Sequence, residues 1–127
     1  MSEFSVKLSV VVPCYNEEGN VDAVFDEAVK VLGERNISFE MIFVNDGSTD
    51  GTMKKLRSVV DRAQVPVRVV DFSRNFGKEA AMMAGLAEVQ GEYAVIMDGD
   101  MQQSPEVVLE MYDLLEGDGE IDCVAAV

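Results

Sequence analysis

Runs of consecutive apolar residues recur along the chain, and most of them have no polar face. This pattern is typical of strands that are covered on both sides. It predicts strands at 8–13, 39–44, 65–72, 93–102 and 121–127. The fourth run ends in two carboxylates, Asp98 and Asp100, with Gly99 between them.

Between these runs, apolar side chains return every three or four residues, which predicts amphipathic helices. The first helical pattern begins at Asn16 and closes near Gly33, and the second follows the 45–51 loop to about Arg62. The third runs from 76 to about 89, and Ser104-Pro105-Glu106 opens a fourth. The apolar face expected for the third helix consists of Ala80, Met83, Ala84 and Ala87.

Strict alternation of strand and helix with short connections predicts an α/β fold, a doubly wound, mainly parallel, Rossmann-like sheet. Ligands of such sheets bind beyond the carboxyl ends of the strands. Polar loops at Asn16, Asp46, Arg74 and Asp98 each follow a predicted strand. We therefore expect these four loops to face one crevice.

Composition narrows the class of protein. A hydrophobic fraction of 48% in 127 residues predicts one globular domain. The net charge of −14 opposes nucleic acid, so a phosphorylated ligand needs a metal ion or local cations. The chain has no histidine, which excludes a His-ligated metal and an imidazole triad. Cys14 and Cys123 fit no metal spacing, so we expect free thiols in the cytoplasm.

The carboxylates of Asp98 and Asp100 are the candidate metal ligands. In a strand they would project to the same face, and Gly99 keeps bulk from between them. Mg²⁺ or Mn²⁺ takes one or two protein carboxylates and leaves positions for water and phosphate oxygens. The alternative is a pair of solvated carboxylates in a turn, which is common in acidic chains.

Asp46 is the candidate ligand of a base or ribose, because a carboxylate accepts hydrogen bonds from ring N–H groups and hydroxyls. A turn or helix-capping role is equally open for Asp46, whereas Asp50 is expected to cap the next helix. Glu17 has two comparable interpretations, a ligand or the acidic first turn of a helix.

Arg74 and Lys78 flank Asn75-Phe76-Gly77 at the start of the third predicted helix. Backbone N–H groups and the helix dipole favour an anion at such a position. In so acidic a chain, cations beside the crevice are informative. A solvated salt bridge is the alternative for each of them.

Four segments in order resemble the motifs of family 2 glycosyltransferases. These are Val12-Pro13-Cys14-Tyr15-Asn16-Glu17-Glu18, Val44-Asn45-Asp46-Gly47-Ser48-Thr49-Asp50-Gly51-Thr52, Ser73-Arg74-Asn75-Phe76-Gly77-Lys78-Glu79-Ala80-Ala81 and Met97-Asp98-Gly99-Asp100-Met101-Gln102. The third segment resembles the branch that transfers sugars to dolichol or bactoprenol phosphate.

The resemblance implies the nucleotide-binding half of a GT-A fold, a UDP- or GDP-sugar donor, Mg²⁺ or Mn²⁺, and inverting transfer to a polyprenyl phosphate or a glycan. By motif position, Pro13, Tyr15, Glu17 and Asp46 are expected to hold base and ribose, and Arg74 and Lys78 lie near the donor. Asp98 is expected to face ribose or a metal-bound water, Asp100 to bind the metal, and Gln102 to lie close by. Together Asp98 and Asp100 form the expected catalytic pair.

Three positions depart from the family pattern. Gln103 stands where an acidic residue or histidine is common, and Ser104 where proline is common. Asn45 occupies the place of a frequent aspartate, which predicts altered base contacts.

The chain ends at Val127 within an apolar run, so we expect residues 1–127 to be the nucleotide-sugar-binding part of a longer enzyme, truncated on its C-terminal side. The isolated part is expected to bind nucleotide, to transfer no sugar, and to self-associate through an exposed sheet edge. Membrane contact at the cytoplasmic face would come only from parts not present here. A receiver-type signalling domain is the remaining alternative, but no lysine follows Lys78 to complete its site.

Overall fold

A computed structural model describes residues 6–97, 99, 105–117 and 123–125. Its strands are β1 (Leu8–Cys14), β2 (Phe39–Asn45), β3 (Val67–Asp71), β4 (Tyr93–Ile96) and β5 (Cys123–Ala125). Its helices are α1 (Val21–Glu34), α2 (Thr52–Arg62), α3 (Lys78–Leu86) and α4 (Pro105–Gly117). Within this described part, no helix combines the length and the apolar character that crossing a membrane requires.

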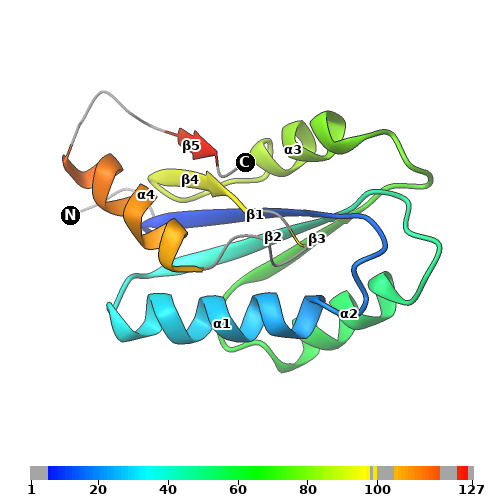
Figure 1. Cartoon of the computed structure of the whole chain (residues 1–127), viewed down its shortest axis with the longest axis horizontal. Coiled ribbons are helices and arrows are strands. Elements are labelled where there is room, and N and C mark those ends of the chain that lie inside the picture. The colour runs from blue at the N-terminus through cyan, green and yellow to red at the C-terminus, as the bar shows by residue number, and fades with distance from the viewer. Residues whose placement is uncertain (1–5, 98, 100–104, 118–122, 126–127) are drawn as a thin grey trace.

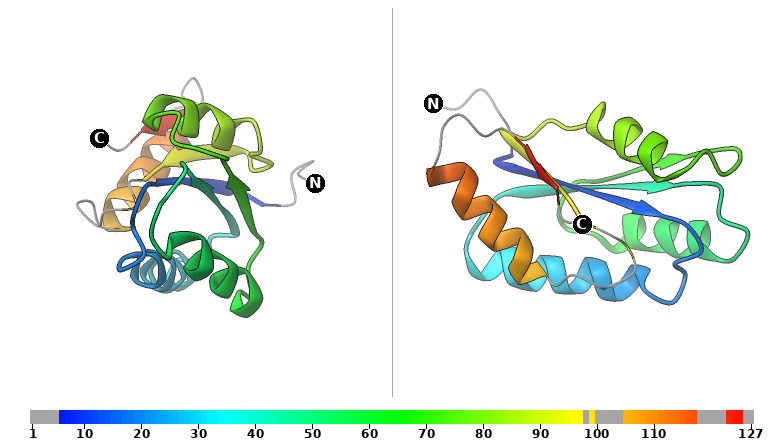
Figure 2. Two further views of the ribbon diagram at one scale, coloured as in Figure 1. Left: turned by 90° about the vertical axis from the view of Figure 1, so that its right-hand side faces the viewer. Right: turned by 45° about the horizontal axis from the view of Figure 1, so that its top comes forward.

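The five strands form one parallel sheet in the order β3-β2-β1-β4-β5 (Figure 1). Helices α1, α2 and α4 pack on one face, and α3 packs on the other (Figure 2). This arrangement confirms the predicted doubly wound sheet. β1 lies at its centre, with all seven residues buried between neighbours on both sides.

The two faces of the sheet bury very different amounts of apolar surface. Alternate residues of β1 and β2, such as Val10 and Phe43, join the large core beneath α1, α2 and α4. The α3 side has a smaller core, formed by Val11, Ile42 and Ile96. The hydrophobic effect therefore fixes the sheet mainly from the α1 side.

The predicted apolar face of α3 was wrong. Met83 is 68% exposed, whereas Ala81 and Gly85 are buried. A Cβ at position 85 would lie 2.4 Å from Cγ1 of Val11, so the small residues let the helix approach β1 closely. The buried stripe therefore combines small residues that permit close approach with Met82 and Leu86, which pack against the core on the α3 side.

The expected start of the first helix was also wrong. α1 begins at Val21, and Asn16 has a φ of 53°, in the left-handed region that cannot continue a helix. Glu17 therefore lies in the loop after β1 and is not part of a helical first turn. The strand likewise continues one residue beyond Pro13, to Cys14.

Candidate functional site

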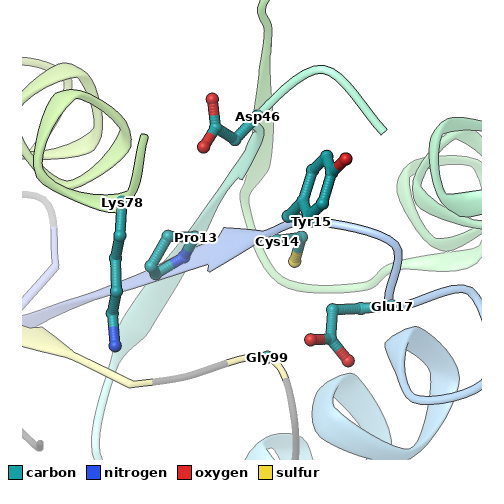
Figure 3. A pocket seen from close by; sticks show the side chains of 7 residues that line it. All are labelled: Pro13, Cys14, Tyr15, Glu17, Asp46, Lys78 and Gly99. Atoms are coloured by element: carbon teal, nitrogen blue, oxygen red, sulfur yellow. The ribbon is translucent and has the colours of Figure 1, made fainter. Parts of the chain in front are cut away.

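A pocket lies where the order of the strands reverses, beyond the carboxyl ends of β1 and β4. In doubly wound sheets this position is the usual ligand site. The pocket has a volume of about 160 Å³. Its lining residues are Pro13, Cys14, Tyr15, Glu17, Asp46, Lys78 and Gly99 (Figure 3). The structure thus brings five of the predicted site residues into one pocket, although their ligand roles stay predictions.

The loop after β1 is held by the loop after β2. The backbone N–H of Asn16 donates to Oγ of Ser48 at 2.9 Å, and its side-chain Oδ1 accepts from the N–H of Thr49 at 2.8 Å. The N–H of Glu17 donates to Oγ1 of Thr52 at 2.9 Å. These bonds between residues more than 30 positions apart fix the backbone that carries Tyr15 and Glu17.

Asp50 was expected to cap α2, but the N-cap is Gly51, and Asp50 supports the start of the helix from one residue earlier. Its Oδ1 accepts hydrogen bonds from the hydroxyl and the backbone N–H of Thr52, at 2.5 and 2.9 Å. The hydroxyl bond lowers the pKa of the Asp50 carboxyl. Thr52 is the first residue of the helix and Gly51 is its N-cap. Gly51 has no side chain, so the Asp50 carboxylate accepts the hydrogen bond from the first helical N–H instead.

Asp46 is almost fully buried, with 3% of its surface exposed. Its Oδ1 accepts from the N–H of Phe76 at 2.8 Å, and its Oδ2 accepts from the N–H of Gly77 at 3.1 Å. The side-chain amide of Asn75 donates to Oδ2 at 3.2 Å. The backbone N–H groups before α3 were expected to bind the anion of a ligand. Those of Phe76 and Gly77 instead bind the carboxylate of Asp46.

Two glycines make this contact possible. Gly47 has a φ of +66°, and a Cβ there would lie 2.1 Å from backbone atoms of Arg74 and Asn75. Gly77 has a φ of +104°, also in the left-handed region. Position 47 needs both a positive φ and the absence of a Cβ, and only glycine provides both. The loop after β2 can therefore lie directly against the backbone before α3.

The two predicted cations have different surroundings. Lys78, the first residue of α3, lines the pocket. The exposed guanidinium of Arg74 lies 4.8 Å from the ring centre of Phe76, and that ring meets Phe72 edge-on at 5.5 Å. Arg74 instead lines a neighbouring hollow that Tyr15 also borders. The structure therefore places Lys78, rather than Arg74, on the pocket that Asp46 lines.

Asn45 is held between two partners at the end of β2. Its Nδ2 donates to Oδ1 of Asp71 at 2.9 Å, and its Oδ1 accepts from the N–H of Ser48 at 3.3 Å. An aspartate at position 45 could not donate to Asp71 and would place two carboxylates together. The sequence departure at Asn45 thus fits its own surroundings.

Cys14 is a pocket residue that the sequence did not single out for a role. Burial, with a smaller contribution from the Glu17 carboxylate, raises the pKa of its thiol to about 12. A Cβ on Gly99 would lie 3.1 Å from Sγ of Cys14 and 3.2 Å from the carbonyl oxygen of Pro13. Gly99 therefore packs closely on the carboxyl end of β1, and its position inside the acidic motif is the sequence signal of this contact.

The acidic residues beside Gly99 lie outside the described residues, as do Gln102, Gln103 and Ser104. β4 ends at Ile96 and Gly99 lies in a turn, so the expected strand geometry does not extend to the motif. Among the described residues, no cluster of three acidic, cysteine or histidine side chains could hold a metal ion. Asp98 and Asp100 fit a divalent metal by their chemistry, because carboxylate oxygens are ligands of Mg²⁺ and Mn²⁺. In the sequence they stand on either side of Gly99, a residue of the pocket wall.

Comparison with known proteins shows a family match. Residues 9–127 match the model of Glycosyl transferase family 2. Dodecaprenyl-phosphate galacturonate synthase of Rhizobium johnstonii is 38% identical over 112 residues, which are 88% of this chain and 33% of that protein. The chain spans about a third of the length of the curated relatives that it matches.

Solved glycosyltransferase structures share the fold of this chain. The mannosyltransferase PcManGT of Pyrobaculum calidifontis, in complex with GDP-Man and Mn²⁺, superposes with a TM-score of 0.72 and 24% identity. The alignment covers 89% of this chain and 33% of that one. Glucosyl-3-phosphoglycerate synthase of Mycobacterium tuberculosis, with Mn²⁺, UDP and glucosyl-3-phosphoglycerate, gives a TM-score of 0.67 at 27% identity over 87% of this chain and 40% of that one.

Proposed function

This chain belongs to glycosyl transferase family 2 and has a GT-A type fold, and on that basis we propose that it binds the nucleotide of a UDP- or GDP-sugar in the pocket between β1 and β4. One observation carries the proposal: Gly99 of the acidic motif packs against Pro13 and Cys14. This contact brings the motif to the wall that Tyr15 and Glu17 also form.

In this proposal, Pro13, Tyr15 and Glu17 hold the base and ribose, and Asp46 shapes the same wall. Lys78 faces the diphosphate as a local cation in an acidic protein, with Arg74 beside the neighbouring hollow. A cation in the pocket offsets the repulsion that a net charge of −14 imposes on a nucleoside diphosphate.

Asp98 and Asp100 would hold Mg²⁺ or Mn²⁺, with Gln102 nearby. When bound, such an ion neutralises the charge that develops on the leaving nucleoside diphosphate. The names of two solved relatives include Mn²⁺ with GDP-Man or UDP, which supports this assignment. Asp98, in addition, is proposed to face the ribose or a metal-bound water.

We assign a polyprenyl phosphate as the acceptor in the whole enzyme, in an inverting reaction at the cytoplasmic face of the membrane. Relatives named dodecaprenyl-phosphate galacturonate synthase and undecaprenyl-phosphate 4-deoxy-4-formamido-L-arabinose transferase support this class. A phosphate oxygen is already an anion, so the acceptor needs no general base, and the absence of histidine is no obstacle.

A second candidate is nucleotide binding without transfer by residues 1–127 alone. This candidate is favoured because the chain corresponds to only about a third of the length of the curated relatives that it matches. A transfer assay with polyprenyl phosphate, run beside a longer chain, separates the candidates. Comparable turnover by the 127-residue chain would exclude the second one.

The proposal predicts that Mn²⁺ strengthens the binding of UDP or GDP and that Asp100→Ala abolishes this coupling. Calorimetric titration of each nucleotide, with and without Mn²⁺, measures both effects. Asp61→Ala, which removes an exposed carboxylate on α2, serves as the matched control and should keep the coupling. If the unmodified chain binds neither nucleotide, the pocket assignment is wrong. If Asp100→Ala retains the coupling, the metal ligands are wrong.

A further inference from the structure

We propose that Asp46 is a positioning residue: its carboxylate holds the backbone before α3 and thereby directs Lys78 into the pocket. This inference rests on the proposed nucleotide site, and it changes the expected role of Asp46. The sequence predicted a direct hydrogen bond to base or ribose, whereas the structure points to an indirect effect on the phosphate side.

The hydrogen bonds of Asp46 carry the first step. Oδ1 receives the N–H of Phe76, and Oδ2 receives both the N–H of Gly77 and the amide of Asn75. Asn75 also donates to the backbone carbonyl of Asp46 at 3.1 Å. A carboxylate that is 3% exposed and accepts three hydrogen bonds has little remaining capacity for a ligand.

The direction of the side chains carries the second step. In Figure 3 the carboxylate of Asp46 points away from Glu17 and Gly99, at the far side of the pocket. Lys78 extends from the start of α3 past Pro13 toward the level of Gly99. The lysine, rather than the aspartate, therefore extends toward the side of the pocket on which Gly99 lies.

Chain connectivity links the two residues. Lys78 follows directly after Gly77, whose N–H is bound to Asp46. Gly77 is in the left-handed region, so the backbone turns sharply immediately before the helix. Holding this N–H fixes the turn, and the turn sets the direction in which the first side chain of α3 leaves the backbone.

The charge of Asp46 is required for this contact. The carboxylate lies at the amino end of α3, where backbone N–H groups and the helix dipole favour negative charge. Asparagine has the same shape but offers one acceptor oxygen, and its NH₂ group would face another N–H donor. Asp46→Asn should therefore release the turn while keeping the volume of the side chain.

A double-mutant cycle tests the link between the two residues. We expect Asp46→Asn to weaken metal-free UDP or GDP binding about tenfold, and to add less than twofold when Lys78 is already alanine. Uridine or guanosine, titrated to millimolar concentration by NMR, should bind Asp46→Asn within twofold of the unmodified chain, because neither has a phosphate. Arg57→Ala, which removes an exposed cation on α2, is the control for charge alone.

The amide protons of Phe76 and Gly77 give a readout that does not depend on nucleotide. Both should move upfield in Asp46→Asn, because the hydrogen bond to a charged acceptor is lost. Asn75→Ala, at an exposed position outside the pocket lining, is the second variant and should cause a smaller shift and a smaller loss of affinity.

Several outcomes would overturn the inference. An equal loss of nucleoside and nucleoside diphosphate binding in Asp46→Asn would show direct contact with base or ribose. A full tenfold loss in the Lys78→Ala background would show that Asp46 does not act through the lysine. Unchanged chemical shifts of the Phe76 and Gly77 amide protons in Asp46→Asn would show that these amides do not donate to the carboxylate. Failure of the unmodified chain to bind nucleotide would instead refute the proposed function, and the amide shifts would still test the contact.

Discussion

At the scale of single residues, Cys14 shows how burial changes chemistry. Its thiol lies in the pocket wall, 2% exposed, and burial raises its pKa from 9.0 to about 12. The folded chain therefore keeps the thiol proton at a pH where the unfolded chain has lost it. This contribution to stability is complete below pH 9 and is lost as the pH rises toward 12.

We predict that the free energy of unfolding of the unmodified chain falls when the pH is raised from 8 to 10. The fall should be about 1 kcal/mol larger than in the Cys14→Ala variant. Urea denaturation at each pH, in a Cys123→Ser background, measures the difference. Because each chain is compared with itself at two pH values, the constant loss of stability from the cavity that alanine leaves does not affect the result. Parallel pH dependence in both chains would show that Cys14 is not the titrating group.

At the scale of elements, one buried carboxylate connects three strands to the segment before β4. Glu40 on β2 is 2% exposed and forms an ion pair at 2.8 Å with Arg68 on β3. Its Oε2 accepts from the hydroxyl of Ser9 on β1 at 2.5 Å and from the N–H of Gln90 at 2.7 Å. The N–H of Gly91 donates to that hydroxyl at 2.8 Å. This polar cluster helps fill the α3 side, where the apolar core is small.

We predict that Glu40→Gln lowers the free energy of unfolding by about 2 kcal/mol, because it leaves the half-buried Arg68 without its charged partner. Hydrogen exchange at the amide of Gln90 should accelerate in the same variant. Glu92→Gln is the control: it breaks an ion pair with Lys7 in which the carboxylate side chain is 34% exposed, against 2% for Glu40, so it should cost clearly less, at most about 1 kcal/mol. Equal costs for the two variants would contradict the role of Glu40.

At the scale of the whole molecule, 24 acidic residues against 10 basic ones give a net charge of −14. Such an excess of one sign destabilises the compact state by self-repulsion. The exposed ion pairs between α1 and α2, which join Arg62 to Asp22 and Asp26, offset this only slightly. Added salt screens the repulsion over distances beyond about 10 Å at 0.1 M.

We therefore predict that Tm rises by a few degrees when NaCl is increased from about 20 to 300 mM, because the screened repulsion outweighs the weakened surface pairs. Differential scanning calorimetry in a non-ionic osmolyte of equal osmolality provides the control for effects other than screening. A fall in Tm would show that local ion pairs dominate the electrostatics.

The sequence alone determined the fold class and the position of most strands and helices. Strand and helix periods are local, so an apolar run such as 39–44 predicts a buried strand without knowledge of its neighbours. Parallel strands also place their carboxyl ends at one edge, which allowed the loops at Asn16, Asp46 and Arg74 to be assigned to one edge of the sheet in advance.

Only the tertiary structure decided which way the side chains point and what they bind. Asp46 and Phe76 are 30 residues apart, and no local pattern reveals that the carboxylate of one accepts from the backbone of the other. The buried stripe of α3 likewise depends on how closely Gly85 can approach Val11. Both results come from contacts between distant parts of the chain, whose geometry is set by packing of the whole sheet and its helices rather than by the residues beside them in the sequence.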